Sequence, residues 1–487
     1  TSVASIVTVS NATPAVAGST IALTATTDAV TGTGGADIFN GVLSGMGGTG
    51  TTAAPGDSID GGAGTDQLTI SVAGASTASY AVSAITSTNL EKLYVSNYDT
   101  GSNDAWDHTI NGSLMTGLTT VGVTSSAALG DTLFSNIKSI VNVDMKNGAG
   151  DLTLNYTTAA KVGTADVQNV SLSNMTAGEL TIAGVESLVV NSHTAANVLA
   201  GITAANATSL TVTGDQNLDL GTTLAATLKT VDASAFTGKL TAIVTATKQT
   251  ITGGTNNDSF DLGTNLSADT TLDGAAGTDT ITISDGADLT ALKSANISNV
   301  EILNADATDS DSFDASFIAG LTQLTASAAL AANEVTFVNV PASITNINVT
   351  GTEGVIATLA TDTAADAITL TLGTATAGVI VTGQTTLINY ETINLVSNGG
   401  ANATAAMSAT DLTTLNITGS QTVTLGTLTG NTAITTVDAS GMTGTGGVVM
   451  NATNGSTTAG TYTGSANADT LIGGTKADTM TGGAGID

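Results

Sequence analysis

The sequence feature that most constrains the fold is a nine-residue pattern, G-G-x-G-x-D-x-U-x, in which U is a large apolar residue. Gly61–Thr69 (GGAGTDQLT) matches it at every position, Gly253–Asp261 and Gly274–Thr282 match it with one or two departures, and tandem copies fill Gly464–Asp487. Gly and Asn accept the positive φ of a tight turn, and the apolar residue after the Asp starts a short strand that faces a core. The pattern therefore predicts half-turn, half-strand units stacked into a parallel β-roll.

The same turns predict calcium binding at multiple sites. The Asp supplies negative charge, the loop carbonyls can point inward, and Ca²⁺ accepts six to eight such oxygens in a flexible geometry that suits Mg²⁺ less well. The predicted ligands are the sixth-position aspartates and the turn residues around them: Asp37, Asp57, Asp66, Asp258, Asp279, Asp469, Asp478, Asp487, Gly32, Gly61, Gly64, Gly253, Asn256, Gly274, Gly277, Gly464, Gly473 and Gly482.

Two of these turns have particular features. Asp57 lies nine residues before Asp66, so we expect it on the next turn of the same roll, and Lys476 places a cation in the Asp478 turn. A single G-x-D turn is otherwise an ordinary tight turn, and it is the shared register of eight aspartates that favours metal sites. Three carboxylates beside these turns are predicted auxiliary ligands: Asp60, Asp261 and Asp273.

Two acidic loops follow repeated Glu-containing strands. They are Asp99–Asp107 (DTGSNDAWD) and Asp306–Asp314 (DATDSDSFD), and they begin eight and five residues after the strand glutamates Glu91 and Glu301. Clustered carboxylates in corresponding places indicate further calcium sites, while a solvated acidic surface loop is the simpler interpretation. The candidate ligands are Asp99, Asp104, Asp107, Asp306, Asp309, Asp311 and Asp314.

The strand-rich sequence between the turns is duplicated. Val231–Gly238 (VDASAFTG) recurs 206 residues later as Val437–Gly444 (VDASGMTG), and Ser209–Gly221 recurs 205 residues later as Thr414–Gly426. Apolar and small polar residues alternate along these stretches, which is the period of strands. Each half is therefore predicted to be a right-handed β-solenoid or a β-sandwich-like array. The predicted segments are a leading segment at 1–30, calcium turns at 31–70, a first body at 71–250, calcium turns at 251–283, a second body at 284–460 and calcium turns at 461–487.

Composition excludes several classes of function. Asp and Glu number 40 against nine Lys and no Arg, so the net charge of −31 disfavours binding to nucleic acid or docking on an anionic membrane and favours divalent cations. No apolar run approaches the roughly 18 residues of a membrane span. The chain begins at Thr1 without a signal peptide, and its last motif stops at Asp487, so we expect a fragment whose targeting signals lie outside it.

The sequence favours a non-enzymatic protein. Its two histidines, His108 and His193, have no Ser-His-Asp or metal-ligand spacing around them, and no nucleophile elbow, H-E-x-x-H helix or P-loop is present. There is no Cys, which excludes disulfides and a thiol nucleophile. We therefore expect no catalytic residues.

The nonapeptides resemble those of the RTX (repeats-in-toxin) proteins, which bind calcium between adjacent turns. The wider arrangement is similar to surface-layer (S-layer) proteins of the Caulobacter type. The resemblance is carried by the G-T-x-G-x-D of Gly32–Asp37, a short insertion, the G-D-S-I-D-G-G-A-G-T-D of Gly56–Asp66, the following Glu strand, the V-D-A-S segment and the return to nonapeptide turns. This resemblance covers nearly the whole chain, with the nonapeptides as its most specific part.

That resemblance implies a secreted structural protein of the cell surface. Such proteins leave the cell by type I secretion and crystallise with calcium into a two-dimensional homo-oligomeric lattice, which a separate region, absent from this sequence, anchors to lipopolysaccharide or another surface partner. An RTX-type calcium-dependent adhesin is the alternative function, although near-identical modules of about 100 residues are not visible. A carbohydrate-cleaving β-helix enzyme is disfavoured because aromatic residues make up only 3% of the chain.

Overall fold

The protein is an all-β solenoid of about 19 turns, with 46% of its residues in strands and 3% in helix. In the computed structural model, the described residues are 16–44, 50–73, 80–82, 85–100, 108–307, 309–329, 334–428, 430–450 and 455–487. Strands of successive turns pair in parallel, as β3 (Ile38–Ser44) does with β5 (Gln67–Ala73) over seven residues. The prediction of an all-β parallel solenoid is confirmed, and of the two architectures left open by the sequence the sandwich-like one is wrong.

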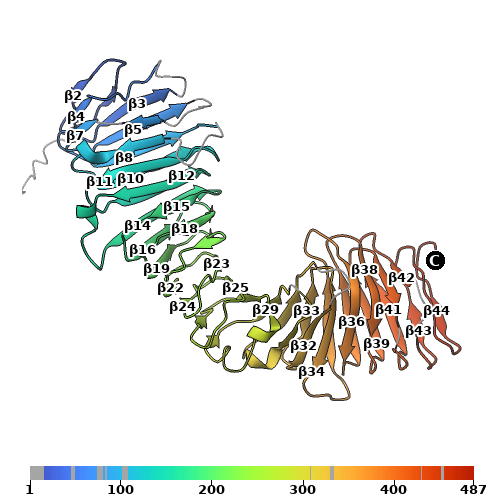
Figure 1. The fold of residues 1–487 in the computed structure, drawn as a ribbon. Helices are drawn as coiled ribbons and strands as arrows, with labels where there is room; N and C mark the ends of the chain where they lie inside the picture. The colour runs from blue at the N-terminus through green and yellow to red at the C-terminus, as the bar shows by residue number, and fades with distance from the viewer. Residues whose placement is uncertain are drawn as a thin grey trace, which may run out of the picture. The chain divides into compact units, whose positions relative to one another are not determined.

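The chain divides into two compact units, Thr1–Thr227 and Leu228–Asp487. In the first unit, successive strands stack as shown in Figure 1. One sheet contains β1 (Thr20–Ala22), β3, β5, β8 (Lys92–Asn97), β10 (Thr120–Ser126), β12 (Asn142–Gly148), β14 (Val167–Met175), β16 (Ser187–Ser192) and β19 (Ser209–Gly214). A second sheet contains β6 (Tyr80–Val82), β9 (His108–Asn111), β11 (Thr132–Ile137), β13 (Leu152–Tyr156), β15 (Glu179–Ile182), β18 (Gly201–Thr203) and β21 (Thr223–Leu224). The remaining elements are β2 (Ala29–Thr31), β4 (Ser58–Asp60), β7 (Thr86–Thr88), β17 (Asn197–Val198), β20 (Leu218–Asp219) and the short 3₁₀ helices η1 (Gly112–Leu114) and η2 (Thr158–Lys161).

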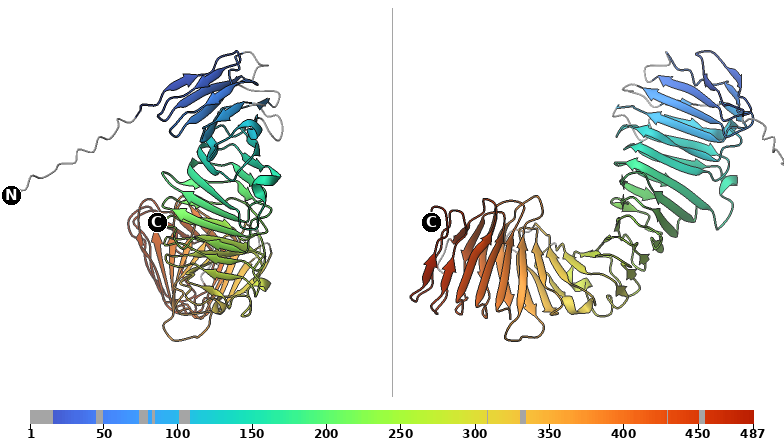
Figure 2. Two further views of the ribbon diagram at one scale, coloured as in Figure 1. Left: turned by 90° about the vertical axis from the view of Figure 1, so that its left-hand side faces the viewer. Right: turned by 180° about the vertical axis from the view of Figure 1, so that it is seen from behind.

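The second unit repeats this plan, and Figure 2 shows its strands from two further sides. One sheet contains β23 (Leu240–Ile243), β25 (Ser259–Gly263), β27 (Thr280–Ile283), β29 (Ile302–Ala305), β31 (Gln323–Ala326), β33 (Asn346–Val349), β35 (Ala367–Leu372), β37 (Thr392–Ser397), β39 (Thr414–Gly419), β41 (Thr436–Met442), β43 (Thr461–Thr463) and β44 (Thr479–Thr481). Another contains β30 (Ser312–Asp314), β32 (Glu334–Val340), β34 (Gly354–Leu359), β36 (Ile380–Ile388), β38 (Asn402–Ser408), β40 (Val423–Thr427) and β42 (Val448–Met450). The other elements are β22 (Thr230–Asp232), β24 (Thr250–Thr252), β26 (Thr271–Asp273), β28 (Ile297–Ser298), η3 (Gly286–Asp288) and η4 (Ala315–Phe317).

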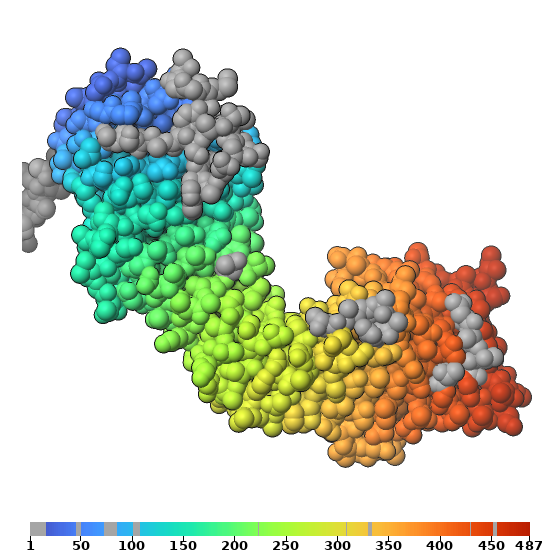
Figure 3. Space-filling model, in the orientation of Figure 1, coloured from blue at the N-terminus to red at the C-terminus, as the bar shows by residue number. Residues whose placement is uncertain are grey.

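Each turn encloses a thin core of alternating apolar residues. Along β16, Leu188 and Val190 are buried while their neighbours are partly exposed, as period-2 strands require. Phe313 and Phe337 pack across neighbouring turns with ring centroids 6.1 Å apart. Burial of one such side chain contributes about 1.5–3 kcal/mol, so stability accumulates turn by turn. Side chains close the spaces between strands at the surface (Figure 3).

The boundary between the two units does not coincide with a predicted segment boundary. It falls between Thr227 and Leu228, inside the 71–250 segment that we expected to form the first body. The glycine-rich turns and the strand-rich bodies share one architecture, since strands of both kinds pair in the same sheets. Within the described ranges, no helix is long and apolar enough to cross a bilayer.

Candidate metal centres in the glycine-rich turns

The predicted aspartates form columns along the stacked turns. In the first unit, Asp37 Oδ1 accepts the backbone N–H of Ser19 (2.5 Å), Asp66 Oδ1 accepts that of Asp37 (2.7 Å), and Glu91 Oε2 accepts that of Asp66 (2.8 Å). Each carboxylate therefore bonds to the backbone of the preceding turn. The side chains of Asp37 and Asp66 are buried at the corner where the turn ends and the strand begins, and Glu91 is partly exposed.

The second unit contains a matching column. Asp258 Oδ1 accepts the N–H of Leu240 (2.7 Å), Asp279 Oδ1 accepts that of Asp258 (2.7 Å), and Glu301 Oε2 accepts that of Asp279 (2.8 Å). Asp258 and Asp279 are 1% and 0% exposed. The structure thus brings together the predicted ligands of neighbouring turns in each unit.

The first glycine of each turn leaves room for two oxygens. A Cβ atom built on Gly61 would come closer than 3.0 Å both to the carbonyl oxygen of Asn89 and to Asp66 Oδ2, nearer than real Cβ atoms come. Gly274 has the same relation to Asn299 O and Asp279 Oδ2. Only glycine allows a backbone carbonyl and a carboxylate to approach the turn from these directions. The same pairing occurs at Gly32, Gly253 and Gly464.

In three of these turns the aspartate is fully hydrogen-bonded. Its Oδ2 accepts the N–H of the second residue of its own turn, at 2.6 Å in each case, while its Oδ1 bonds to the preceding turn. The pairs are Thr33 with Asp37, Gly254 with Asp258, and Ser465 with Asp469. These carboxylates are satisfied by the protein alone.

In the other two turns the second-residue N–H is taken by a different carboxylate. Gly62 N–H bonds to Asp60 Oδ1 (3.2 Å), and Asp66 Oδ2 is left buried without a hydrogen-bond partner. Asn89 Nδ2 also donates to Asp60, at 2.9 Å. A buried carboxylate oxygen without a partner is costly, because it has lost water without a replacement.

The second unit repeats this arrangement. Ala275 N–H bonds to Asp273 Oδ1 (3.0 Å), Asn299 Nδ2 bonds to the same oxygen (2.7 Å), and Asp279 Oδ2 has no partner. The auxiliary residues Asp60 and Asp273 are therefore the groups that leave Asp66 and Asp279 unpaired.

Burial and neighbouring charge disfavour ionisation of the unpaired aspartates. Burial raises the pKa of Asp279 to about 6; the N–H of Asp258 opposes this, and the charges of Asp258, Glu301 and Asp273 add to it. Burial likewise raises the pKa of Asp66, with Glu91, Asp37 and Asp60 adding to the effect. A bound cation would relieve both causes, since it replaces lost hydration and neutralises the crowded charge.

The donor set fits calcium better than a transition metal. Among the described residues, no three Asp, Glu or His side chains come together as a metal-binding group. Each turn instead offers one carboxylate next to one carbonyl of a neighbouring turn. Ca²⁺ combines carboxylates, carbonyls and water in this way, whereas Zn²⁺ requires four N, S or O side-chain ligands or three and a water.

The prediction that Asp57 lies on the next turn of the same roll as Asp66 is wrong in its placement. Asp57 precedes β4, which pairs with β2 and β7, whereas Asp66 precedes β5 in another sheet. Nine residues complete only half of a coil, so aspartates stack at every second nonapeptide. Asp57 is instead bonded to the N–H groups of Asp28 (2.9 Å) and Ala54 (2.8 Å).

The carboxyl-terminal aspartates show the same alternation. Asp487 Oδ1 accepts the N–H of Asp469 (3.0 Å), eighteen residues earlier, while Asp478 bonds to Gly460 N–H (2.8 Å) and Gly474 N–H (2.9 Å). The remaining predicted turn residues serve local structure: Gly64 and Gly277 have φ of 128° and 143°, Asn256 Oδ1 accepts Asn257 N–H, and Asp261 Oδ1 accepts Gly263 N–H.

The acidic loops use several of their carboxylates within the fold. Asp99 is 1% exposed and lies 3.2 Å from Nε2 of His108, whose pKa is lowered by burial and partly restored by Asp99. Asp314 accepts Ser316 N–H (3.0 Å) at the start of η4. Asp104 and Asp107 lie outside the described residues.

Asp309 and Asp311 lie side by side in the second acidic loop. Burial, followed by the hydrogen bond that protonated Asp311 can donate to Asp309, raises the pKa of Asp311 to about 6, and the charges of Asp309 and Asp285 add to this. Asp306 is exposed. Metal binding by either loop stays a prediction.

Sequence reasoning missed the glutamates that complete the columns. Glu91 and Glu301 were noticed as repeated strand markers but not as partners of Asp66 and Asp279. The signal was their fixed position after an Asn with positive φ, Asn89 or Asn299 (54° and 51°). Two more glutamates accept aspartate N–H groups in the same way: Glu186 from Asp166 and Glu391 from Asp366.

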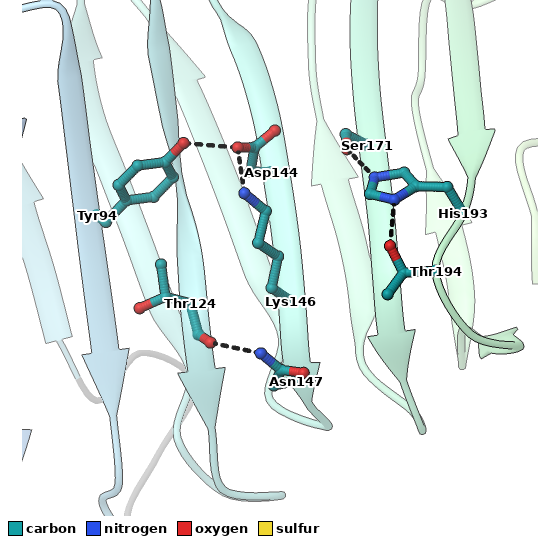
Figure 4. A network of polar contacts seen from close by, with 8 residues as sticks. All are labelled: Tyr94, Thr124, Asp144, Lys146, Asn147, Ser171, His193 and Thr194. Atoms are coloured by element: carbon teal, nitrogen blue, oxygen red, sulfur yellow. Dashed lines mark hydrogen bonds and ion pairs between the residues drawn. The ribbon is translucent and has the colours of Figure 1, made fainter. Parts of the chain in front are cut away.

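A separate polar network crosses the outer face of the first unit's sheet (Figure 4). Tyr94 reaches over Gly122 on the intervening strand and donates to Asp144 Oδ2 (2.6 Å), which also pairs with Lys146 (2.9 Å). A shallow hollow of about 290 Å³ lies along this row. The network fits a structural role, because the tyrosine covers the strand position that lacks a side chain.

His193 lies farther along the same face. Its Nε2 is 2.8 Å from Ser171 Oγ, and its Nδ1 is 2.7 Å from Thr194 Oγ1 (Figure 4). A serine next to a histidine is two thirds of a catalytic triad, but here a hydroxyl occupies the place of the orienting carboxylate. The sequence did not reveal this pair because its members are 22 residues apart on neighbouring turns.

No family model matches the sequence, and no curated protein matches it.

Proposed function

We propose that this chain is the lattice-forming part of a calcium-requiring surface-layer protein of the RTX type. The observation that carries the proposal is the pair of unpartnered, fully buried carboxylate oxygens at Asp66 and Asp279, each set against a backbone carbonyl. One lies in each unit, and the Asp66 turn matches the nonapeptide at every position. A calcium ion at each would complete the turn.

Charge links calcium binding to assembly. Two copies carrying −31 each repel one another, and monovalent salt screens that repulsion only beyond about 8 Å. Bound divalent cations lower the charge locally and fix the turns in one conformation that a neighbouring copy can recognise. Extracellular calcium modules bind calcium with dissociation constants of about 10⁻⁴ to 10⁻³ M. The protein would therefore stay unassembled at the low calcium concentration inside a cell and assemble outside it. Secretion by the type I route and anchoring to lipopolysaccharide belong to the same proposal.

Light scattering and electron microscopy across a calcium titration test the function, with magnesium as the matched control. We expect monomers in chelator and ordered two-dimensional sheets at millimolar calcium. Chelation should also lower the midpoint of thermal unfolding, and an unchanged midpoint would rule out structural calcium. A protein that binds calcium but stays monomeric at saturation would indicate the adhesin function instead.

A further inference from the structure

A third buried carboxylate has no hydrogen-bond partner, and it lies outside every nonapeptide. Glu353 follows β33 in the second unit, is 1% exposed, and has neither Oε1 nor Oε2 hydrogen-bonded. Its surroundings are G-T-E-G (Gly351–Gly354), a sequence with none of the spacing of the calcium turns. It is the only glutamate among the buried polar residues of the described chain.

The geometry around Glu353 nevertheless repeats that of the nonapeptide turns. A Cβ atom on Gly351 would come closer than 3.0 Å both to the carbonyl oxygen of Ala328 and to Glu353 Oε2. This is the relation that Gly61 has to Asn89 and Asp66. The turn is three residues shorter, and the longer glutamate side chain spans the difference.

Electrostatics point the same way. Burial raises the pKa of Glu353 to about 7; the nearby backbone N–H groups of Glu353 and Ala328, which lie outside hydrogen-bonding geometry, partly oppose this, and the exposed Asp306 adds negative charge. Asp306 is the first residue of the second acidic loop, so this loop adds negative charge close to the Gly351–Glu353 turn. Ala328 O already accepts Thr352 N–H at 3.0 Å and keeps a second lone pair for a cation.

We propose that the Gly351–Glu353 turn is a further divalent-cation site, with Glu353 as carboxylate ligand and Ala328 as carbonyl ligand. Calcium is the fitting ion, because it accepts a bidentate carboxylate together with carbonyls and water. This site does not depend on lattice formation, and it adds a cation to the second unit beyond the one at Asp279.

The test is Glu353→Gln in the full chain, with Glu334→Gln as the matched control. Glu334 belongs to β32 in the same unit and is partly exposed, with Oε1 near Gln384 N–H at 3.3 Å. Equilibrium dialysis at about 1 mM free calcium should show one fewer bound ion per chain for Glu353→Gln and no change for Glu334→Gln. In chelator at pH 8, Glu353→Gln should unfold at a higher temperature than the wild type, because it removes a buried charge, but calcium should raise its midpoint less.

An unchanged ion count in Glu353→Gln would overturn this site and leave Glu353 as a buried carboxyl group that binds no ion. If the glutamine variant fails to fold, Glu353→Asp keeps the charge, shortens the side chain, and should lose the same ion. The proposed function fails separately: a wild type that binds no calcium, or whose count is unaffected by Asp66→Asn and Asp279→Asn, contradicts the calcium turns themselves.

Discussion

Replacing Asp279 by Asn should stabilise the protein when calcium is absent and destabilise it when calcium is present. Asn keeps an oxygen for Asp258 N–H, removes the buried charge, and turns an N–H donor toward Asn299 O. Without calcium the variant should therefore be more stable than the wild type. With calcium the order should invert, because the variant lacks the anionic ligand.

The size follows from linkage between protonation and folding. The pKa of Asp279 is raised from 3.8 to about 6, so the native state binds this proton more tightly than the unfolded state does. Ionisation of Asp279 therefore costs the native state free energy relative to the unfolded state. This loss of stability is absent below pH 3.8, grows as the pH rises, and is complete above about pH 6. It amounts to about 3 kcal/mol at pH 8, or roughly 6–12 °C in the unfolding midpoint of a unit this large.

Thermal unfolding of both proteins at pH 8, in chelator and in millimolar calcium, measures this. Asp258→Asn is the matched control, because both of its oxygens accept backbone N–H groups. There an amide N–H₂ would face another donor, and we expect a loss of about 1–3 kcal/mol in either condition. The reasoning would be refuted if Asp279→Asn unfolded at a lower temperature than the wild type in chelator. It would also be refuted if calcium raised the unfolding midpoint of the variant as much as that of the wild type.

Two further substitutions test the turn chemistry. Gly61→Ala should destabilise the first unit with or without calcium, because its Cβ would lie 2.7 Å from Asp66 Oδ2 and still nearer to Asn89 O. We expect faster limited proteolysis of the variant, and resistance equal to that of the wild type would contradict the prediction. Asp60→Thr should free Gly62 N–H to bond Asp66, as Thr33 does with Asp37, so one fewer calcium ion should bind while the chelated protein becomes more stable. Isothermal titration and melting together decide the second case, and an unchanged ion count would count against it.

The sequence could predict the parallel roll because its determinants are local. The glycines that allow the turn and the apolar residue that starts the strand lie within nine residues, as Gly61–Thr69 illustrates. It could not choose between a solenoid and a sandwich for the bodies, since both have period-2 strands. It misplaced Asp57 because the pattern does not say that one nonapeptide is half a coil.

Other parts of the site depend on residues distant in sequence. Glu91 bonds to Asp66 only because the intervening coil brings them into register 25 residues apart. Glu353 was invisible for a similar reason: its partner carbonyl, Ala328 O, belongs to the preceding turn, and the turn itself is too short to match the pattern. Contacts between neighbouring turns, and not the sequence of a single turn, decide which carboxylates remain without a hydrogen-bond partner.

The residue before the first glycine separates the two kinds of calcium-type turn. Thr31, Thr252 and Thr463 precede the turns whose aspartates are fully bonded, and Asp60 and Asp273 precede those whose aspartates are not. A threonine leaves the second-residue N–H free for the sixth-position Asp, whereas an aspartate captures it. Because the captured N–H must be replaced, we expect a position just outside the nonapeptide to decide which turns need a cation. Turns that look alike within the pattern should then differ in their dependence on calcium.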